Sequence, residues 1–149
     1  MFYEKPVVSQ ETVLKMLEAA LQKASELEIN VNVAIMDDGG NLKAFVRMDD
    51  APLLSSEIAQ NKAYTAVAFG IPTADWYPMI QKQPSLLHGI VHTDRLVIFG
   101  GGLPMYIGKH LVGGIGVSGG TAEQDVIIAE AALTVFEEDV KQHKSNERR

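Results

Sequence analysis

Cysteine is absent from the 149 residues of this sequence. The absence excludes disulfides, thiolate zinc sites, iron–sulfur clusters and a cysteine nucleophile, and it fits a cytoplasmic protein. No apolar run approaches the roughly 18 residues that a membrane-spanning helix needs. Residues 1–6 also lack the basic and then apolar plan of a signal peptide. We therefore expect a cytoplasmic protein with no membrane partner.

Basic residues are scarcer than acidic ones. The chain has 13 lysine and arginine residues against 19 aspartate and glutamate residues, a formal net charge of -6. We expect no nucleic-acid partner, because a phosphate backbone requires a clustered basic surface. The hydrophobic fraction of 46% and the charged fraction of 21% are ordinary for a globular protein. We expect one domain over residues 1–149.

Hydrophobic periodicity predicts helices and strands in the order αββααβββα. The expected helices cover residues 10–27, 52–69 and 74–81 and a last helix that begins at residue 121. The expected strands cover residues 31–36, 42–48, 96–99, 105–107 and 111–117. Because the strands occur in hairpins, we expect an α+β fold with an antiparallel sheet of about five strands layered with helices.

Short polar and small-residue patterns refine these elements. Residues 37–41, Asp-Asp-Gly-Gly-Asn, are typical of a hairpin turn. One face of the second helix carries Ala59, Ala63 and Ala66, small enough for another element to pack closely on it. Residues that favour helix N-caps precede the expected helices: Ser9, Asp49 or Asp50, Thr73, and Thr121, which forms a capping box with Gln124.

Two glycine motifs overlap before the last helix. Residues 114–119 match the dinucleotide fingerprint G-x-G-x-x-G, and residues 116–120 match G-x-S-x-G. The first motif requires a further parallel strand. The second requires an acid and a histidine on later strands, and only His143 follows, in a polar tail. The glycines then either make a strand-to-helix turn or let the backbone N–H groups of residues 119–121 bind a carboxylate or phosphate.

Three consecutive glycines, Gly100, Gly101 and Gly102, precede Leu103 and Pro104. Such residues lose much chain entropy on folding and bury no side chain. Something is therefore expected to approach their backbone closely. A ligand and a neighbouring helix are both open.

Three charged residues are candidates for a site. Arg47 and Asp49 flank Met48 at the end of a strand and can pair with each other or orient an anionic ligand. Lys62 lies in the middle of a helix beside its small-residue face. If Lys62 is buried, it needs a partner or a shifted pKa, and otherwise it reaches solvent.

The i, i+4 spacing of His88 and His92 could place both on one metal ion if they lie on a helix. Gly89, Ile90 and Val91 between them weaken the helix prediction, and no H-E-x-x-H arrangement is present. The alternative is a pair of partly exposed loop histidines. We assign no metal site.

Four segments together resemble the GlcG/HbpS family, also called the haem-degrading domain family. The resemblance spans nearly the whole chain. The segments are Val33–Asp37 with Gly40–Leu42, Arg47–Ala51, Lys62–Ala66, and Phe99–Pro104 continuing into Gly113–Gly120 and Gln124–Asp125.

The resemblance implies a profilin-like or GlcG-like fold, a five-stranded antiparallel sheet flanked by helices, and assembly into homo-oligomers. Some family members bind haem or its iron, and related domains are fused to corrinoid-handling enzymes. Asp50 stands where relatives often have glycine. Neither His88 nor His92 aligns with a haem ligand of the family, so haem binding is expected here only from the resemblance.

The expected ligand pocket combines charged residues and glycine turns: Arg47, Asp49, Lys62, Gly100, Gly101, Gly102, Ser118, Gly119 and Gly120. The leading hypothesis is a protein that binds a small molecule, either haem or a related planar or anionic compound. The second is an enzyme acting on a small carbonyl compound or hydroxy acid, with Asp49 or Lys62 moving protons. The third is an accessory or assembly protein in which the glycines serve packing.

Overall fold

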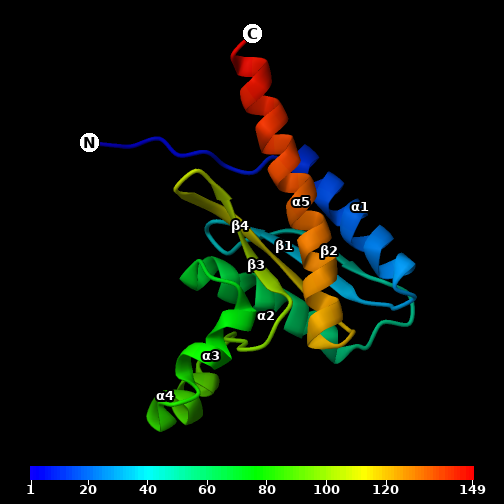
Figure 1. The fold of residues 1–149 in the computed structure, drawn as a ribbon, viewed down its shortest axis with the longest axis vertical. Coiled ribbons are helices and arrows are strands. Elements are labelled where there is room, and N and C mark those ends of the chain that lie inside the picture. Colours follow the sequence, from blue (N-terminus) through cyan, green and yellow to red (C-terminus); the bar gives the residue numbers. More distant parts are fainter.

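The computed structural model describes residues 1–149 as an α+β fold (Figure 1). The strands are β1 (Asn32–Asp37), β2 (Leu42–Arg47), β3 (Gly102–Ile107) and β4 (His110–Ser118). The helices are α1 (Gln10–Glu26), α2 (Leu54–Phe69), α3 (Trp76–Ile80), α4 (Pro84–Gly89) and α5 (Ala122–Glu147), with short 3-10 helices η1 (Thr73–Asp75) and η2 (Ile90–His92).

The sheet has the strand order β2-β1-β4-β3, and every neighbouring pair is antiparallel. Helix α2 packs on one face, and α1 and α5 pack together on the other (Figure 1). The larger core lies between the sheet and α1 and α5, where Met16, Ile35, Ile115 and Phe136 are buried. Side chains alternate along a strand, so the neighbours of Ile35 and Ile115 face α2.

The sheet approaches α2 closely because the facing residues on both elements have very small side chains or none. Gly114 and Gly116 of β4 face Ala59 and Ala63 of α2, which belong to a second, smaller core. A Cβ atom on Gly116 would lie 2.5 Å from the backbone nitrogen of Ala63. The predicted close packing on the small-residue face of this helix is therefore confirmed, and the glycines of β4 are what packs there.

The sheet has four strands, so the prediction of about five is wrong at residues 96–99. That segment runs along α2 as irregular chain. The backbone nitrogen of Val97 donates to the hydroxyl of Thr65 at 3.1 Å, and the same hydroxyl donates to the carbonyl of Arg95 at 2.9 Å. A helix side chain thus takes the hydrogen bonds that a strand partner would otherwise make.

Two of the predicted helix caps are confirmed and two are wrong. The hydroxyl of Ser9 accepts from Thr12, and Thr121 with Gln124 forms a reciprocal capping box. Helix α2 begins at Leu54 without a side-chain cap. Asp50 instead occupies a left-handed conformation with φ of 64°, which explains why glycine suits this position. The hydroxyl of Thr73 accepts from the backbone of Gly102 at 2.9 Å instead of capping a helix.

Other local predictions are also resolved by the structure. Residues 37–41 form the expected turn, with the carboxylate of Asp37 accepting from the backbone nitrogens of Gly39 and Asn41, each at 2.9 Å. Residues 84–92 form α4 and η2, which periodicity did not assign. None of the helices combines the length and the apolar character that crossing a membrane requires.

Helices α1 and α5 are joined by a polar contact at Asp139. Its carboxylate accepts from the hydroxyl of Thr12 and lies 3.0 Å from the ammonium of Lys15. These two contacts, the Thr12 hydrogen bond first, lower the pKa of Asp139. A lowered folded-state pKa contributes stability above the unfolded value, and this contribution is lost as the pH falls through the folded value.

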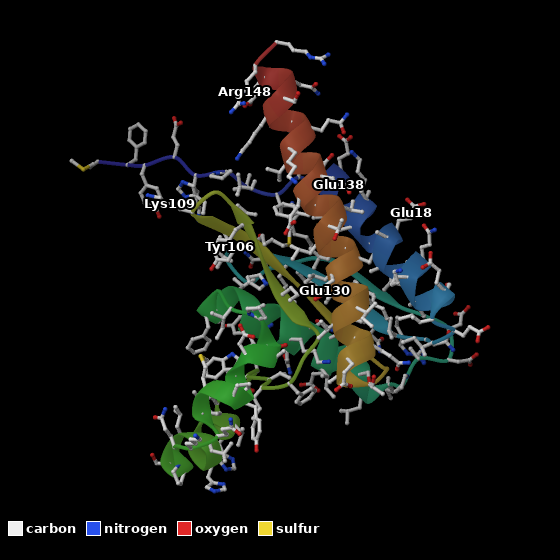
Figure 2. The ribbon with its side chains drawn as sticks, viewed as in Figure 1. Glu18, Tyr106, Lys109, Glu130, Glu138 and Arg148 are labelled. Carbon is white, nitrogen blue, oxygen red and sulfur yellow. The ribbon has the colours of Figure 1, made fainter.

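We therefore expect Asp139→Asn to lower the free energy of unfolding by up to about 1 kcal/mol at neutral pH, since the contact is partly exposed. The difference from the wild type should shrink toward zero in acid. Urea unfolding at pH 7 and at the lowest pH where the protein stays folded measures both values. Glu138→Gln on the exposed side of α5 is the control (Figure 2). A deficit that is unchanged in acid would contradict the assignment.

Candidate functional site

Three polar residues form a row across one end of the sheet. Asn32 of β1 lies opposite Arg47 of β2 on one side and opposite Ser118 of β4 on the other. Residues directly opposite each other in antiparallel strands point to the same face. That face is the α2 face, because Ala34 and Met36, which alternate with the core-facing residues of β1, belong to the α2 core. Neighbouring strands are about 4.8 Å apart, so the row runs roughly 10 Å from β2 to β4.

Asn32 is the residue of this row that sequence reasoning did not identify. It is fully buried, and its side-chain nitrogen donates to the carbonyl of Pro52 at 3.2 Å. Its side-chain oxygen has no hydrogen-bond partner. A buried acceptor without a partner costs about 1–3 kcal/mol, so it marks a place where a donor belongs. The available signal in the sequence was an amide within the apolar run of residues 31–36.

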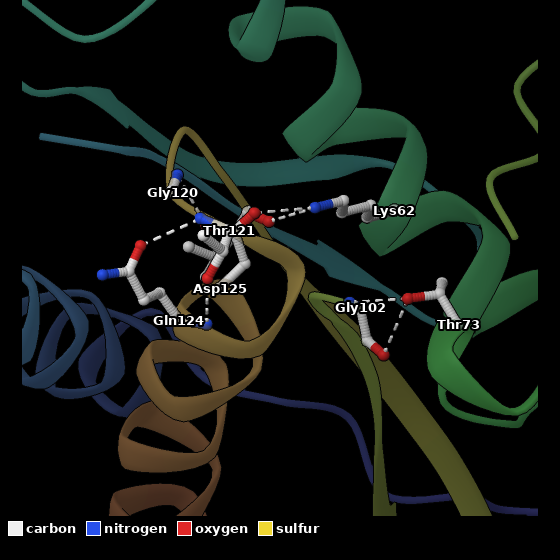
Figure 3. Close-up of polar contacts among 8 residues, drawn as sticks. Lys62, Thr73, Gly102, Gly120, Thr121, Gln124 and Asp125 are labelled. Atoms are coloured by element: carbon white, nitrogen blue, oxygen red, sulfur yellow. Dashed lines mark hydrogen bonds and ion pairs between the residues drawn. The ribbon is translucent and has the colours of Figure 1, made fainter. Parts of the chain in front are cut away.

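Lys62 is buried on α2 and reaches across to the end of β4 and the start of α5. Its ammonium donates to the carbonyl of Val117 at 2.8 Å and to the carboxylate of Asp125 at 3.1 Å (Figure 3). It also lies 5.1 Å from the centre of the Phe99 ring, within cation–π range. The alternative in which Lys62 is buried with a partner is therefore the observed one.

Asp125 holds this arrangement from the first turn of α5. One carboxylate oxygen accepts a hydrogen bond from the ammonium of Lys62, and the other accepts one from the backbone nitrogen of Gly120 at 2.9 Å (Figure 3). Burial raises the pKa of Asp125, and the nearby charge of Lys62 opposes that shift. Burial likewise lowers the pKa of Lys62, opposed by the charge of Asp125. Each partner therefore depends on the other to remain charged away from water.

The protein's own atoms fill the space beside the three consecutive glycines. A Cβ on Gly100 would lie 2.7 Å from a side-chain methyl of Val126. One on Gly101 would lie 2.7 Å from the Lys62 ammonium, and one on Gly102 would lie 2.5 Å from the Lys62 carbonyl. Of the two open alternatives, close approach of neighbouring helices is the one this structure shows.

The turn at Ser118–Gly120 also uses its donors within the chain. The backbone nitrogen of Gly120 donates to Asp125, and that of Thr121 donates to the side chain of Gln124 at 2.9 Å (Figure 3). Gly119, with φ of 142°, lies against the backbone of Asn30 and Val31. Two of the three N–H groups considered for anion binding are therefore taken.

The structure brings together most, but not all, of the expected pocket. Lys62, the three glycines and the turn at Ser118–Gly120 meet where α2, β4 and α5 converge, and Ser118 continues the row to Arg47. Arg47 and Asp49 are both exposed and make no ion pair, with each other or with any residue. Of the two alternatives, the salt bridge between Arg47 and Asp49 is absent, which leaves the guanidinium of Arg47 free.

The four histidines lie away from this region. All are exposed: His88 and His92 on α4 and η2, His110 on the β3–β4 hairpin, and His143 near the end of α5. No three histidine, aspartate or glutamate side chains are placed to hold a metal ion. The row offers amide, hydroxyl and guanidinium groups and no imidazole.

The fold and this row define an α+β protein whose antiparallel sheet carries polar groups beneath a single covering helix. The family model of haem-degrading, HbpS-like proteins matches residues 8–134. The chain therefore belongs to the HbpS-like family, and the resemblance to GlcG and HbpS proteins is confirmed.

Relatives with solved structures share the fold closely. The chain is similar to protein ORFY of Klebsiella pneumoniae, with a TM-score of 0.84 and 35% identity over 92% of this chain and 97% of that one. It is also similar to PduOC in a haem complex, with a TM-score of 0.81 and 36% identity over 87% and 95% of the two chains. A 15.0 kDa uncharacterised protein from the dhaT–dhaS intergenic region of Citrobacter freundii is 44% identical over 83% of this chain and 88% of its own length.

Proposed function

We propose that this protein binds a small planar or anionic molecule at the row formed by Arg47, Asn32 and Ser118. The observation that carries the proposal is the buried side-chain oxygen of Asn32, which has no partner. Because Asn32 is fully buried, a ligand donor reaches that oxygen when the covering loop at Pro52 moves aside, and the contact then recovers the free energy lost by leaving the oxygen unpaired. Membership of a family in which PduOC forms a haem complex supports a small-molecule ligand.

Each neighbouring group supplies a different part of such a site. Arg47 carries a guanidinium with no ion pair, which suits a ligand carboxylate. Ser118 adds a hydroxyl between Asn32 and the Lys62 contact. The ring of Phe99 is 49% exposed and offers an aromatic face to a planar ligand. Lys62 is neutralised by Asp125, so Arg47 is the cation available for an anion.

Haem fits this site only in part. Its flat ring and its carboxylates match the face of Phe99 and the guanidinium of Arg47. Its iron would find no histidine, because all four lie elsewhere in the chain. We therefore expect the ring and the carboxylates, and not the iron, to determine binding.

This expectation separates two related probes, haemin and iron-free protoporphyrin IX. Both should bind saturably, with dissociation constants within about threefold of each other, because the iron contributes little. Absorption titration in the Soret region and quenching of protein fluorescence measure the two affinities. Arg47→Gln should weaken both by about tenfold, which corresponds to one charge-assisted hydrogen bond of about 1.4 kcal/mol.

Lys109→Gln, on the exposed β3–β4 hairpin, is the matched control and should leave both affinities unchanged (Figure 2). Much tighter binding of haemin than of the iron-free ring would show that a protein ligand reaches the iron. If neither probe bound saturably, the proposed site would be wrong. It would also be wrong if Arg47→Gln and Lys109→Gln lost the same affinity.

A proton-transfer role is the second candidate, and one observation favours it. Burial shifts the pKa values of Lys62 and Asp125 in opposite directions, a pattern that also occurs at catalytic sites. The ammonium of Lys62 is nevertheless fully engaged by Val117, Asp125 and Phe99. Asp49 is exposed and makes no ion pair, so nothing in the structure supports a role for it as a catalytic base.

We infer in addition that copies of this chain associate with one another. The observation that supports homo-oligomers is the number of large apolar side chains that the single chain leaves exposed, among them Leu53 at 78% and Leu54 at 70%. Such surface is normally covered in an oligomer.

A further inference from the structure

Residues 81–93, which include α4 and η2, form an arm that buries none of its helical residues. Neither α4 nor η2 contains a buried side chain, although Leu86, Leu87, Ile90 and Val91 are all apolar. The arm packs mainly on α3 and projects away from the sheet (Figure 1). Helices this short are not stable in water without tertiary contacts. The arm therefore needs a surface that its own chain does not provide.

The start of α2 is a second surface without cover. Leu53 and Leu54 are 78% and 70% exposed. The sixteen residues of α2 include only two charged ones, Glu57 and Lys62, and Lys62 points inward to Asp125. The exposed residues of α2 are Leu54, Glu57, Ala68 and Phe69, so its outer side presents apolar side chains around a single charge. The outer side of α2 is thus suited to contact with protein.

The two surfaces carry opposite charge. The arm carries one formal positive charge, Lys82, and no acidic residue. Residues 49–61 contain Asp49, Asp50 and Glu57 and no basic residue. Complementary charge favours the docking of one surface on the other and disfavours the docking of either surface on itself.

The two surfaces lie at opposite ends of α2. Leu53 and Leu54 are at its start, whereas α3 and the arm follow its end, where the rings of Phe69 and Trp76 are 4.7 Å apart. A helix of 16 residues is about 24 Å long, so the surfaces are too far apart to meet within one chain. A two-fold axis through the middle of α2 would place the arm of each copy on the α2 start of the other.

We propose that the chain forms a two-fold symmetric dimer in which each arm, residues 81–93, covers the start of α2 in the partner copy. The inference depends on the self-association proposed above and adds the surfaces that make it. Phe69, Tyr77 and Met79, each at least half exposed at the arm end of α2, extend the apolar contact.

The absence of cysteine makes a direct test possible, because each introduced thiol is the only one in its chain. Leu54→Cys and Val91→Cys chains are coexpressed, purified under reduction and then mildly oxidised. We expect a disulfide between position 54 of one chain and position 91 of another, identified by mass spectrometry of the linked peptide. Glu130→Cys on the outer side of α5 replaces Leu54→Cys in the matched control and should link at least tenfold more slowly (Figure 2).

The mass of the unmodified protein in solution, measured by light scattering, separates the possible failures. A monomer at all concentrations would overturn self-association itself. An oligomer that links position 91 to position 130 as fast as to position 54 would overturn the assigned surfaces while leaving self-association intact.

Charge reversal provides an independent check. Glu57→Lys should weaken the dimer by about tenfold, because the arm then meets a surface of its own sign. Adding Lys82→Glu in the same chain should restore at least part of the affinity. A double variant no tighter than Glu57→Lys alone would contradict the pairing of these surfaces.

Discussion

Replacing Asp125 with asparagine should lower the free energy of unfolding by about 3–5 kcal/mol, because removal of one partner leaves the other charge buried. The side chains of Lys62 and Asp125 are only 1% and 3% exposed, so both charged groups are buried. Asparagine keeps an oxygen for the backbone nitrogen of Gly120, so the substitution isolates the lost charge. Such a loss is a large share of the 5–15 kcal/mol that stabilises a typical domain.

The pH dependence of this variant identifies Lys62 as the source of the loss. Burial lowers the pKa of Lys62, and Asp125 supplies the opposing charge, so the pKa falls further in Asp125→Asn. When the folded-state pKa of a lysine lies below its unfolded value, the unfolded chain binds more protons between the two values, and stability rises with pH. The deficit should therefore shrink as the pH rises from the folded-state pKa of Lys62 in the variant toward the higher folded-state pKa of Lys62 in the wild type.

Urea unfolding of four proteins measures the coupling directly: the wild type, Asp125→Asn, Lys62→Met and the double variant. Partners in one ion pair couple by about 0.5–3 kcal/mol, so the double variant should lose less than the sum of the single losses. Lys109→Met and Glu130→Gln, both exposed, are matched controls and should change stability by less than about 0.5 kcal/mol. If the losses in the free energy of unfolding were additive, the two residues would not be coupled. A loss in Asp125→Asn that stays the same at all pH values would likewise contradict the role of the pair.

The parts of the fold that sequence predicts well are those that local chemistry determines. The turn at residues 37–41 follows from residues that tolerate its backbone, and the capping box at Thr121 and Gln124 lies within one helical turn. The strand predicted at residues 96–99 fails for the opposite reason. An apolar run does not reveal that Thr65, thirty-two residues before Val97, takes its hydrogen bonds. Four strands therefore remain where five were expected.

The candidate site was predicted as a set of residue types and not as a geometry. Lys62 was expected to need a partner if buried, but Asp125 lies 63 residues away along the chain. The row of Arg47, Asn32 and Ser118 depends on strand register, which only the paired strands reveal. Three consecutive glycines indicate close approach equally for a ligand and for a neighbouring element. Composition alone gives no way to choose between them.

Replacing Gly116 with alanine should lower the free energy of unfolding by about 3 kcal/mol or more, toward the upper end for overpacked cores. The added Cβ would press against the carbonyl oxygen of Ala59 and lie 2.5 Å from the backbone nitrogen of Ala63. Both atoms belong to the backbone of α2, so no side-chain rotation can relieve the contact. The helix as a whole must move off the sheet.

That movement would also disturb the proposed site. Lys62 of α2 donates a hydrogen bond to the carbonyl of Val117, and the loop before α2 accepts one from Asn32 at the carbonyl of Pro52. Gly116→Ala should therefore weaken porphyrin binding as well as folding. Gly89→Ala is the matched control: no atom lies within 4 Å of its added Cβ, so stability should change by less than about 1 kcal/mol. Ala59→Gly should fail to rescue Gly116→Ala, because the obstructing atom is a backbone oxygen that glycine retains. Rescue by Ala59→Gly, or wild-type stability of Gly116→Ala, would show that α2 does not lie on β4 at this distance.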